Sequence, residues 1–299
     1  MHIPSSMLNG AICPVTVAVG IAGTGLAVYY ARKSDDQPSA MKFSAVTAMV
    51  FALQMLNFSV QNGTSGHLMG SVLAMALLGV PYAIISMAVV LTVQSVFFAD
   101  GGINALGANV INMAFIGVGV AGVIFEALKR MSVPKNISLA ITACVSIMAA
   151  SIACSLEVAA AGAVSLNKVL PAMLSVHALI AIGEIAITVA ILAGLFAYQR
   201  MFKANQAMLS IAAFVFACIA AMLSPFASNF PDGLEYVSER LAFMSFSGVN
   251  AGALFPDYHA SFIANQGLST ICAGLAGVAI VSIVAQMAAH GIKLVRDRK

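Results

Sequence analysis

The sequence predicts an all-α polytopic membrane protein. Its 299 residues are 61% hydrophobic and only 8% charged, whereas soluble domains carry about 25% charged residues. The mean hydropathy is +0.98, and many apolar runs are long enough to cross about 30 Å of hydrocarbon. We therefore expect a multi-pass protein of the cell (inner) membrane, with the lipid bilayer as its surroundings and no nucleic acid as a partner.

About nine transmembrane helices are expected. Eight apolar runs have the length of a membrane span, and a shorter ninth run over residues 67–79 is separated from the next by the turn signal Gly-Val-Pro at 79–81. The longer runs cover residues 11–31, 42–58, 81–98, 107–128, 137–160, 172–199, 207–224 and 266–290. No basic residue precedes Arg32, so the first run lacks the basic start of a signal peptide and is expected to be retained.

The basic residues predict the orientation of the chain. With the N-terminus outside and the C-terminus in the cytoplasm, 12 of the 14 Lys and Arg residues fall on the cytoplasmic side, as the positive-inside rule requires. Three segments rich in loop residues then share the outer face with the N-terminus: 58–67, 97–109 and 224–259. The last is too long for a simple connection, so we expect it to lie over or near the N-terminal site.

The first two residues can chelate a metal ion. A chain that begins Met1-His2 offers the α-amine, the His2 amide nitrogen and the His2 imidazole, which close a five-membered and a six-membered ring around one ion. A square-planar set of nitrogens is typical of Ni(II) or Cu(II), and it needs one further donor. His67, in the glycine-containing segment Asn-Gly-Thr-Ser-Gly-His at 62–67, is the candidate on the same face.

Two ionisable residues fall within one predicted span. His177 and Glu184 are seven residues apart, which places them on one face of a helix, and ionisable groups inside a membrane are costly and often functional. They fit interhelical hydrogen bonding, coupling to a partner, a role in the route of the ion, or the proton relay of an ion-coupled secondary transporter. These interpretations stay open at this point.

Several stretches resemble a known family. The start Met-His-Ile-Pro, together with QMLNFSVQNGTSGHLMG at 54–70, FADGGINALGANVINM at 98–113 and IAIGEIAIT at 180–188, resembles the M component of nickel/cobalt importers of the energy-coupling-factor (ECF) type, the CbiM/NikM family. The tail, with SPFASNFPDGLEYV at 224–237 and FPDY at 255–258, resembles the PDGLE-type N component, fused here. The expected domains are 1–203 (M component, about seven transmembrane helices) and 204–299 (N component, two helices with a long extracytoplasmic loop).

The resemblance implies a non-catalytic transporter subunit. In the family the ion is held by nitrogens that correspond to Met1, His2 and His67, and a transmembrane coupling protein (T component) and cytoplasmic ATPases drive uptake. No G-x-x-x-x-G-K-[ST] motif occurs, so ATP hydrolysis must come from those partners. No cofactor is expected. Many members of the family carry an acidic residue directly after the first four residues. This chain has Ser5 and Ser6 there.

The predicted function is capture of Ni(II) on the extracytoplasmic face for ATP-driven import. Nickel is favoured over Co(II) by the square-planar donor set and by the PDGLE tail. A cobalt importer component of the same family, serving cobalamin synthesis, is the close alternative. An ion-coupled secondary metal transporter and a membrane metal sensor are the alternatives from other classes.

Overall fold

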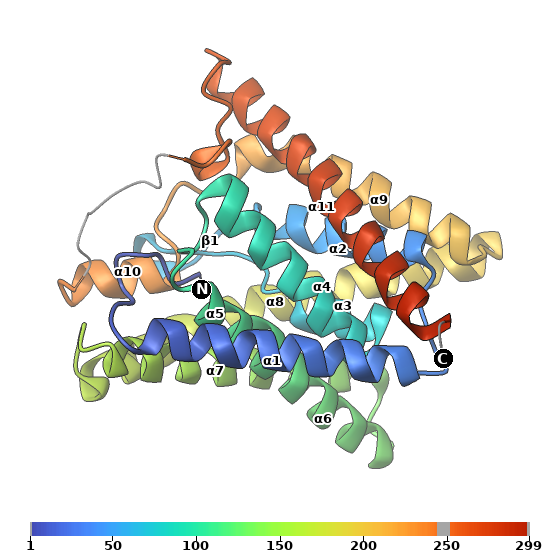
Figure 1. Cartoon of the computed structure of the whole chain (residues 1–299), viewed down its shortest axis with the longest axis horizontal. Coiled ribbons are helices and arrows are strands. Elements are labelled where there is room, and N and C mark those ends of the chain that lie inside the picture. The colour runs from blue at the N-terminus through green and yellow to red at the C-terminus, as the bar shows by residue number, and fades with distance from the viewer. Residues whose placement is uncertain (1, 244–251, 298–299) are drawn as a thin grey trace.

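The protein is a bundle of helices, and the computed structural model describes residues 2–243 and 252–297 (Figure 1). The α-helices are α1 (Ile12–Lys33), α2 (Ala40–Gln54), α3 (Ser71–Leu78), α4 (Val80–Val93), α5 (Leu106–Asn109), α6 (Gly117–Arg130), α7 (Lys135–Ala160), α8 (Leu166–Phe202), α9 (Gln206–Leu223), α10 (Gly233–Arg240) and α11 (Gln266–Asp297). Two-residue strands β1 (Phe58–Ser59) and β2 (Ser65–Gly66) form an antiparallel hairpin. The chain is all-α apart from this hairpin within the described residues.

Seven helical segments in the described part of the chain are long and apolar enough to cross a membrane. They are Ile12–Lys33, Val80–Phe98, Leu106–Arg130, Lys135–Ala160, Leu166–Phe202, Gln206–Phe226 and Gln266–Arg296. The expected nine include two shorter helices: α2 has 15 residues and α3 has eight, or about 22 and 12 Å at 1.5 Å per residue. The number of complete crossings therefore stays a prediction, whereas a multi-pass membrane protein is confirmed.

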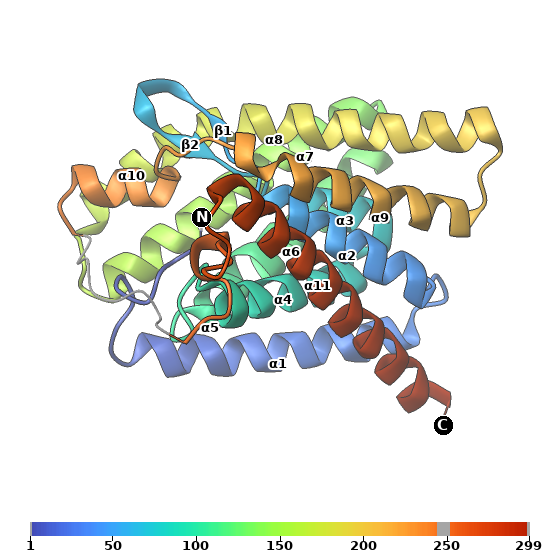
Figure 2. The same cartoon turned by 90° about the horizontal axis from the view of Figure 1, so that it is seen from above.

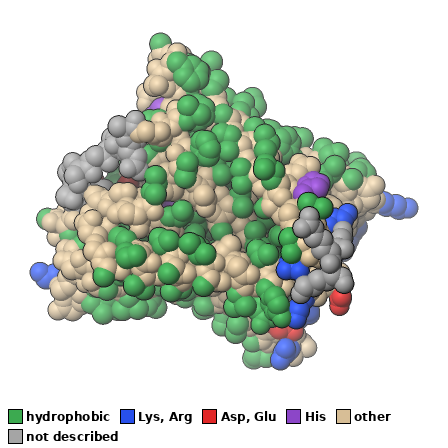
Figure 3. Space-filling model, in the orientation of Figure 1, with side chains coloured by type: hydrophobic (Ala, Val, Ile, Leu, Met, Phe, Trp, Pro, Cys, Tyr) green, Lys and Arg blue, Asp and Glu red, His purple; other side chains and the backbone are tan. Residues whose placement is uncertain are grey.

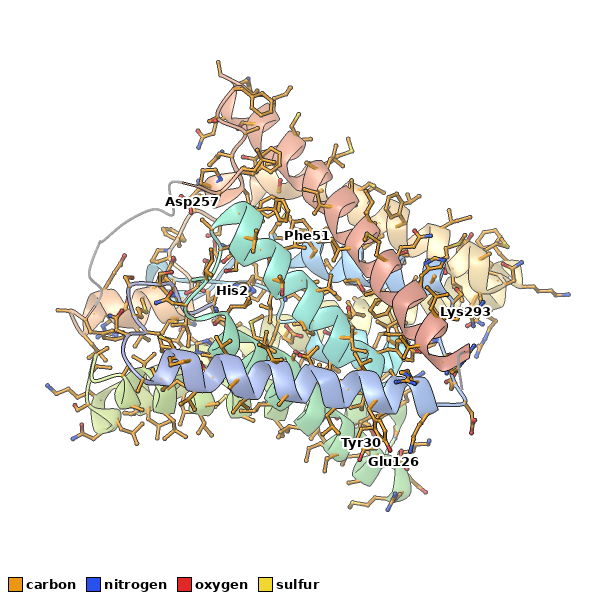
Figure 4. The ribbon with its side chains drawn as sticks, in the orientation of Figure 1. His2, Tyr30, Phe51, Glu126, Asp257 and Lys293 are labelled. Carbon is orange, nitrogen blue, oxygen red and sulfur yellow. The ribbon has the colours of Figure 1, made fainter. Side chains whose placement is uncertain are left out.

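The two ends of the bundle differ in their charge. Hydrophobic side chains cover much of the visible surface along the helices, and Lys and Arg gather mainly at one end (Figure 3). Tyr30, Glu126 and Lys293 lie toward that end, and His2 lies toward the other (Figure 4). The N-terminal segment and the main basic cluster are thus on opposite ends, while the assignment of each end to a side of the membrane remains a prediction.

Helix α2 forms the centre of the bundle. Every residue from Phe43 to Gln54 is buried, because α3 and α4 cover one part of its surface and α9 and α11 cover another. The expected division at residues 203 and 204 falls in the short turn between α8 and α9. Helices from both sides of this turn share the core around α2, and the division into two domains stays a prediction.

The loop and turn residues end the helices where the sequence indicates. Gly79 has a φ of +76° between α3 and α4, a conformation that glycine adopts without strain, and Pro81 lies in the first turn of α4, where its missing N–H costs nothing. Two π-helical turns, η2 (Gln94–Phe98) and η3 (Val110–Ile116), follow α4 and α5. Such turns occur often at functional sites, and η2 leads into the loop beside His2.

Candidate metal centre

The N-terminal segment is inserted into the protein interior. Ile3, Met7 and Leu8 are almost completely buried, so apolar contacts hold a segment that is mobile in most chains. The Asn109 side chain holds the backbone of Ile3 at two points. Asn109 Oδ1 accepts from Ile3 N at 2.8 Å, and Asn109 Nδ2 donates to Ile3 O at 3.1 Å. The residue next to His2 is therefore clamped.

The loop before α5 lies directly against this segment. Gly102 N donates to Ile3 O at 2.9 Å, and a Cβ atom at Gly102 would lie 2.4 Å from the backbone nitrogen of Ser5. Asn104 donates to the carbonyl oxygens of Ser5 and Leu8 at 3.1 and 2.8 Å. The Gly-Gly-Ile-Asn sequence at 101–104 thus supplies close approach and hydrogen bonds to the N-terminal segment.

The hairpin β1–β2 positions His67, which follows β2 directly in the sequence. A Cβ atom at Gly66 would lie 2.7 Å from the Ile180 side chain of α8, so glycine lets the strand pack on that helix. Ser65 N donates to Pro231 O at 2.8 Å, and the Ser65 hydroxyl donates to Phe230 O at 2.7 Å. The His67 segment is therefore held between α8 and the segment that leads into α10, which lies at the same end of the bundle (Figure 2).

The structure brings two of the three predicted ligand residues together. The imidazole rings of His2 and His67 stack with their centroids 5.1 Å apart and an angle of 23° between their planes. Both side chains are largely buried. Met1, the third predicted ligand residue, lies outside the described residues.

The two imidazoles are neutral bases in this setting. Burial lowers the pKa of His2 to about 3 and that of His67 to about 3, because a charged ring loses its hydration inside the protein. His67 Nδ1 lies 3.0 Å from Leu68 O, an acceptor, so Nδ1 carries the proton and Nε2 carries the lone pair. A metal ion requires this uncharged form.

A carboxylate faces each histidine. Oδ1 of Asp100 lies 3.4 Å from His2 Nδ1, and Oδ2 of Asp232 lies 3.8 Å from His67 Nε2. The Tyr258 hydroxyl donates a hydrogen bond to the other oxygen of Asp100. Burial raises the pKa of Asp100, and this hydrogen bond opposes the rise. Nitrogen lone pairs and carboxylate oxygens at these distances form a site that attracts a cation.

The Pro-Asp-Gly-Leu-Glu sequence at 231–235 builds one wall of the site. Asp232 Oδ1 accepts from the backbone nitrogens of Leu234 and Glu235 at 2.8 and 2.9 Å, and Glu235 Oε2 accepts from Asp232 N at 3.1 Å. This capping box starts α10 and turns Oδ2 of Asp232 toward His67. The charge of Asp232, together with burial, raises the pKa of Glu235 to about 7.

Gly233 completes that wall by allowing close packing. A Cβ atom there would lie 2.8 Å from Ile180 and 3.0 Å from His177. The first turn of α10 can therefore rest directly on α8.

The histidines and carboxylates line one cavity of about 320 Å³. Its lining residues are His2, Pro4, Gln54, Met55, Asn57, His67, Ala99, Asp100, Gly101, Asp232, Glu235, Asp257 and Tyr258. No three His, Cys, Asp or Glu side chains in 2–243 and 252–297 form a metal-binding group.

His177 and Glu184 lie on α8 as predicted, but each has its own partner. Glu184 is completely buried and accepts from the backbone nitrogens of Met69 and Gly70 at 2.6 and 3.1 Å. His177 Nδ1 donates to Met173 O at 2.8 Å within the helix. Glu184 therefore fixes the backbone just after His67, which favours the interpretation of interhelical hydrogen bonding.

Sequence reasoning missed several residues of the site. Gln94 Oε1 lies 3.1 Å from His2 Nε2, and Gln54 hydrogen-bonds Gln94. A polar amide within or at the end of an apolar run is a signal that could have identified both glutamines. Asn109 is likewise a polar amide within an apolar run. The roles of Asp232 and Tyr258 depend on tertiary packing, which brings each of them to the site.

Comparisons with known proteins agree with this architecture. Residues 2–202 match the family model described as "Cobalt uptake substrate-specific transmembrane region", and residues 207–294 match the PDGLE domain. A putative fused nickel transport protein NikMN of Archaeoglobus fulgidus is 33% identical over 290 residues, which cover 94% of this chain and 95% of that protein.

Two further matches cover part of the chain. The cobalt transport protein CbiM of Clostridium cellulovorans is 34% identical over 112 residues, or 38% of this chain and 43% of that protein. A crystal structure of a transition metal transporter superimposes with a TM-score of 0.61 at 30% identity, covering 69% of this chain and 95% of that one. The chain belongs to the family of cobalt uptake substrate-specific transmembrane regions, and it is a multi-pass membrane protein of metal transport, not an enzyme.

Proposed function

We propose that this protein is the ion-capturing component of an ECF-type nickel importer. Ni(II) would be held in a plane of four nitrogens: the amine of Met1, the amide and imidazole Nδ1 of His2, and Nε2 of His67. The observation that carries the proposal is the stacking of His2 and His67, 65 positions apart in the sequence, at a centroid distance of 5.1 Å. The chelate of the N-terminal dipeptide would leave one position open, and Nε2 of His67 would fill it.

The charges around the site fit such a complex. Binding displaces the amide proton of His2, so a divalent ion on three neutral donors and one anionic donor keeps a single net positive charge. Asp100 and Asp232 lie beside the two histidines and can balance that charge without being ligands. Binding is expected to release protons.

Nickel is preferred to cobalt on two grounds. Four nitrogens in one plane suit Ni(II). The relative that matches nearly the full length of this chain is named as a fused nickel transport protein, whereas the cobalt transport protein matches a shorter stretch. Cobalt import by the same site is the alternative, and competition between the two ions in a binding assay distinguishes them.

Partner proteins would drive transport. The sequence carries no phosphate-binding G-x-x-x-x-G-K-[ST] loop, so the energy of ATP must reach the protein from a transmembrane coupling protein and cytoplasmic ATPases. Uptake should therefore require these partners. Uptake that continues without them and collapses with the proton gradient would instead support a secondary transporter.

The test combines three changes to the ligand set. His2→Ala and His67→Ala each remove one imidazole, and an extension of two residues before Met1 moves the amine away from the chelate. An extension by one residue is avoided because it would create a different chelate with two backbone amides. Binding of Ni(II) to the purified protein and uptake by cells that carry the partner proteins are measured for each.

All three variants are expected to lose the absorption band of square-planar Ni(II) and to lose uptake. His290→Ala is the matched control, because His290 is exposed near the end of α11. Binding and uptake that match the unaltered protein in all three variants would reject the proposed site.

A further inference from the structure

A chain of hydrogen bonds joins His2 to the segment that carries His67. Gln54 Nε2 donates to Met69 O at 2.8 Å, Gln94 Nε2 donates to Gln54 Oε1 at 2.8 Å, and His2 Nε2 lies 3.1 Å from Gln94 Oε1. The side chains of His2, Gln54 and Gln94, which form this series of hydrogen bonds, are all buried. Met69 is only two residues from His67, so the chain links the two proposed ligand segments.

The chain has a fixed direction. The Met69 carbonyl oxygen can only accept, so the Gln54 amide must present its NH₂ group to it and its oxygen to Gln94. Gln94 then donates its NH₂ group to that oxygen and turns its own oxygen toward His2. The orientation of a side-chain amide is usually assigned from such a hydrogen-bond network. Here the carbonyl of Met69 determines the amide orientations of both Gln54 and Gln94.

The orientation of Gln94 determines the tautomer of His2. Each ring nitrogen of His2 faces an acceptor: Gln94 Oε1 lies 3.1 Å from Nε2, and Asp100 Oδ1 lies 3.4 Å from Nδ1. The shorter contact, to Gln94, favours the proton on Nε2 and leaves the lone pair on Nδ1. Nδ1 is the nitrogen that closes the six-membered ring with the His2 amide. With the proton on Nδ1, an N–H would point at the metal position and two acceptors would face each other at Nε2.

We propose that Gln54 and Gln94 are positioning residues that hold His2 in its metal-binding tautomer and tie that tautomer to the backbone of the His67 segment. Hydrogen-bonded neighbours of metal-binding histidines commonly fix ring orientation and raise ligand basicity. This inference rests on the proposed function for its effect on nickel. The tautomer itself is a property of the metal-free protein.

This series of hydrogen bonds also couples the two proposed ligand segments. A shift of the backbone at Met69 moves the acceptor that orients Gln54, so the state of the His67 segment is transmitted to the His2 ring over two side chains. Glu184 holds the Met69 and Gly70 amides from the other side. The two histidines are therefore prepared together for one ion.

The test replaces each glutamine by methionine, which has a similar shape and no hydrogen bond. The tautomer of His2 is measured by ¹⁵N NMR of metal-free protein with labelled histidine, and His2→Ala assigns its signals among the five histidines. The unaltered protein is expected to show the Nε2–H form of His2, and Gln94→Met a mixture of tautomers. The affinity for Ni(II) should fall about 10- to 100-fold, as for other neighbours of metal ligands.

Gln54→Met interrupts the series of hydrogen bonds at a residue that does not hydrogen-bond His2. It removes the acceptor on Gln54 that orients the Gln94 amide, so a mixture of tautomers is expected. The loss of affinity should be smaller than in Gln94→Met, because Tyr258 still hydrogen-bonds Gln94. The double variant should bind Ni(II) no more weakly than Gln94→Met alone, because residues that act as one unit are not additive. Independent packing effects of the two residues would instead multiply the two losses.

Thr47→Val is the matched control. Thr47 is buried on α2 like Gln54, and it hydrogen-bonds Ser86 of α4 at 2.9 Å, so its loss weakens the same pair of helices away from the site. It should change neither the His2 tautomer nor the affinity. The proposal is overturned if His2 keeps the Nε2–H form in Gln94→Met and Gln54→Met, or if both bind Ni(II) like the unaltered protein. Failure of the unaltered protein to bind Ni(II) would reject the proposed function and leave the tautomer result standing.

Discussion

Tyr258 donates a hydrogen bond to Asp100, a residue 158 positions earlier in the chain. The same C-terminal segment pairs its backbone with the earlier loop, because Phe255 N donates to Phe97 O at 2.8 Å. Asp100 in turn faces His2. The C-terminal part of the chain therefore contributes Asp257 and Tyr258 to the wall of the cavity that His2 and His67 line.

Removal of the Tyr258 hydroxyl should weaken nickel binding. Tyr258→Phe keeps the ring packed on Phe98 but leaves the oxygen of Asp100 without its donor, so the carboxylate beside His2 is less well fixed. A hydrogen bond of this kind contributes about 0.5–1.5 kcal/mol, so the Kd for Ni(II) should rise by roughly two- to tenfold. Isothermal titration measures it. Tyr236→Phe on α10 is the control, and an equal effect of both variants would contradict the role of Tyr258.

The charge of Asp232 should favour capture of the ion. Asp232→Asn keeps the start of α10, since Asn and Asp are equally good N-caps, and removes the negative charge beside His67. A charge pair at partly buried sites is worth a few kcal/mol at most, so we expect a Kd for Ni(II) that is about tenfold higher and less sensitive to salt. Titrations at two salt concentrations measure both. Asp35→Asn, exposed in the loop after α1, should leave affinity unchanged.

The sequence could predict His2 and His67 as candidate ligands because the chemistry that points to them is local. The predicted Met1-His2 chelate follows from covalent connectivity, and the choice of His67 follows from its place in a glycine-containing segment that is predicted to lie on the same face. Asp100 and Asp232 could not be assigned in this way, since their distances to the histidines depend on how loops from three parts of the chain fold together. These two carboxylates also supply the negative charge that Ser5 and Ser6 do not.

The limits of the ninth predicted span have a similar cause. The apolar run begins at residue 67, but α3 begins at Ser71. The backbone nitrogens of Met69 and Gly70 are bonded to Glu184, and Gly70 has a φ of +78°, so this stretch cannot continue the helix. Apolar composition indicates that the segment is buried, and it does not reveal that the backbone of Met69 and Gly70 is bonded to Glu184.

The Asn109 clamp should be required for the site. Asn109→Leu leaves the buried N–H and C=O of Ile3 without the partners that Asn109 provides, although Gly102 still donates to that carbonyl. Each unsatisfied group costs about 1–3 kcal/mol, so the N-terminal segment should detach part of the time and both stability and nickel affinity should fall. Thermal unfolding and titration measure the two effects. Asn136→Leu, on the exposed start of α7, is the control. A stable Asn109→Leu protein with normal affinity would contradict the clamp.

Nickel itself should stabilise the folded protein. At an ion concentration of 100 times the Kd, binding to the folded state alone adds about 2.7 kcal/mol, which raises the midpoint of thermal unfolding. His67→Ala should lose this gain without changing the midpoint of the metal-free protein by a similar amount. A chelator should reverse the shift. An equal shift in His67→Ala would place the stabilising ion elsewhere.

Glu184→Gln separates a positioning role from a proton relay. The Gln side chain keeps one acceptor for Met69 or Gly70 but turns an NH₂ group toward the other amide, so the backbone after His67 should shift and nickel affinity should fall. The loss of one hydrogen bond to a charged group corresponds to about 1.5–3 kcal/mol, or roughly a 10- to 100-fold higher Kd. A proton relay predicts the opposite pattern, with normal binding in equilibrium titrations and loss only of uptake driven by a proton gradient. Leu192→Val, two turns further along α8 and also buried, is the control for packing, and its affinity should stay near that of the unaltered protein.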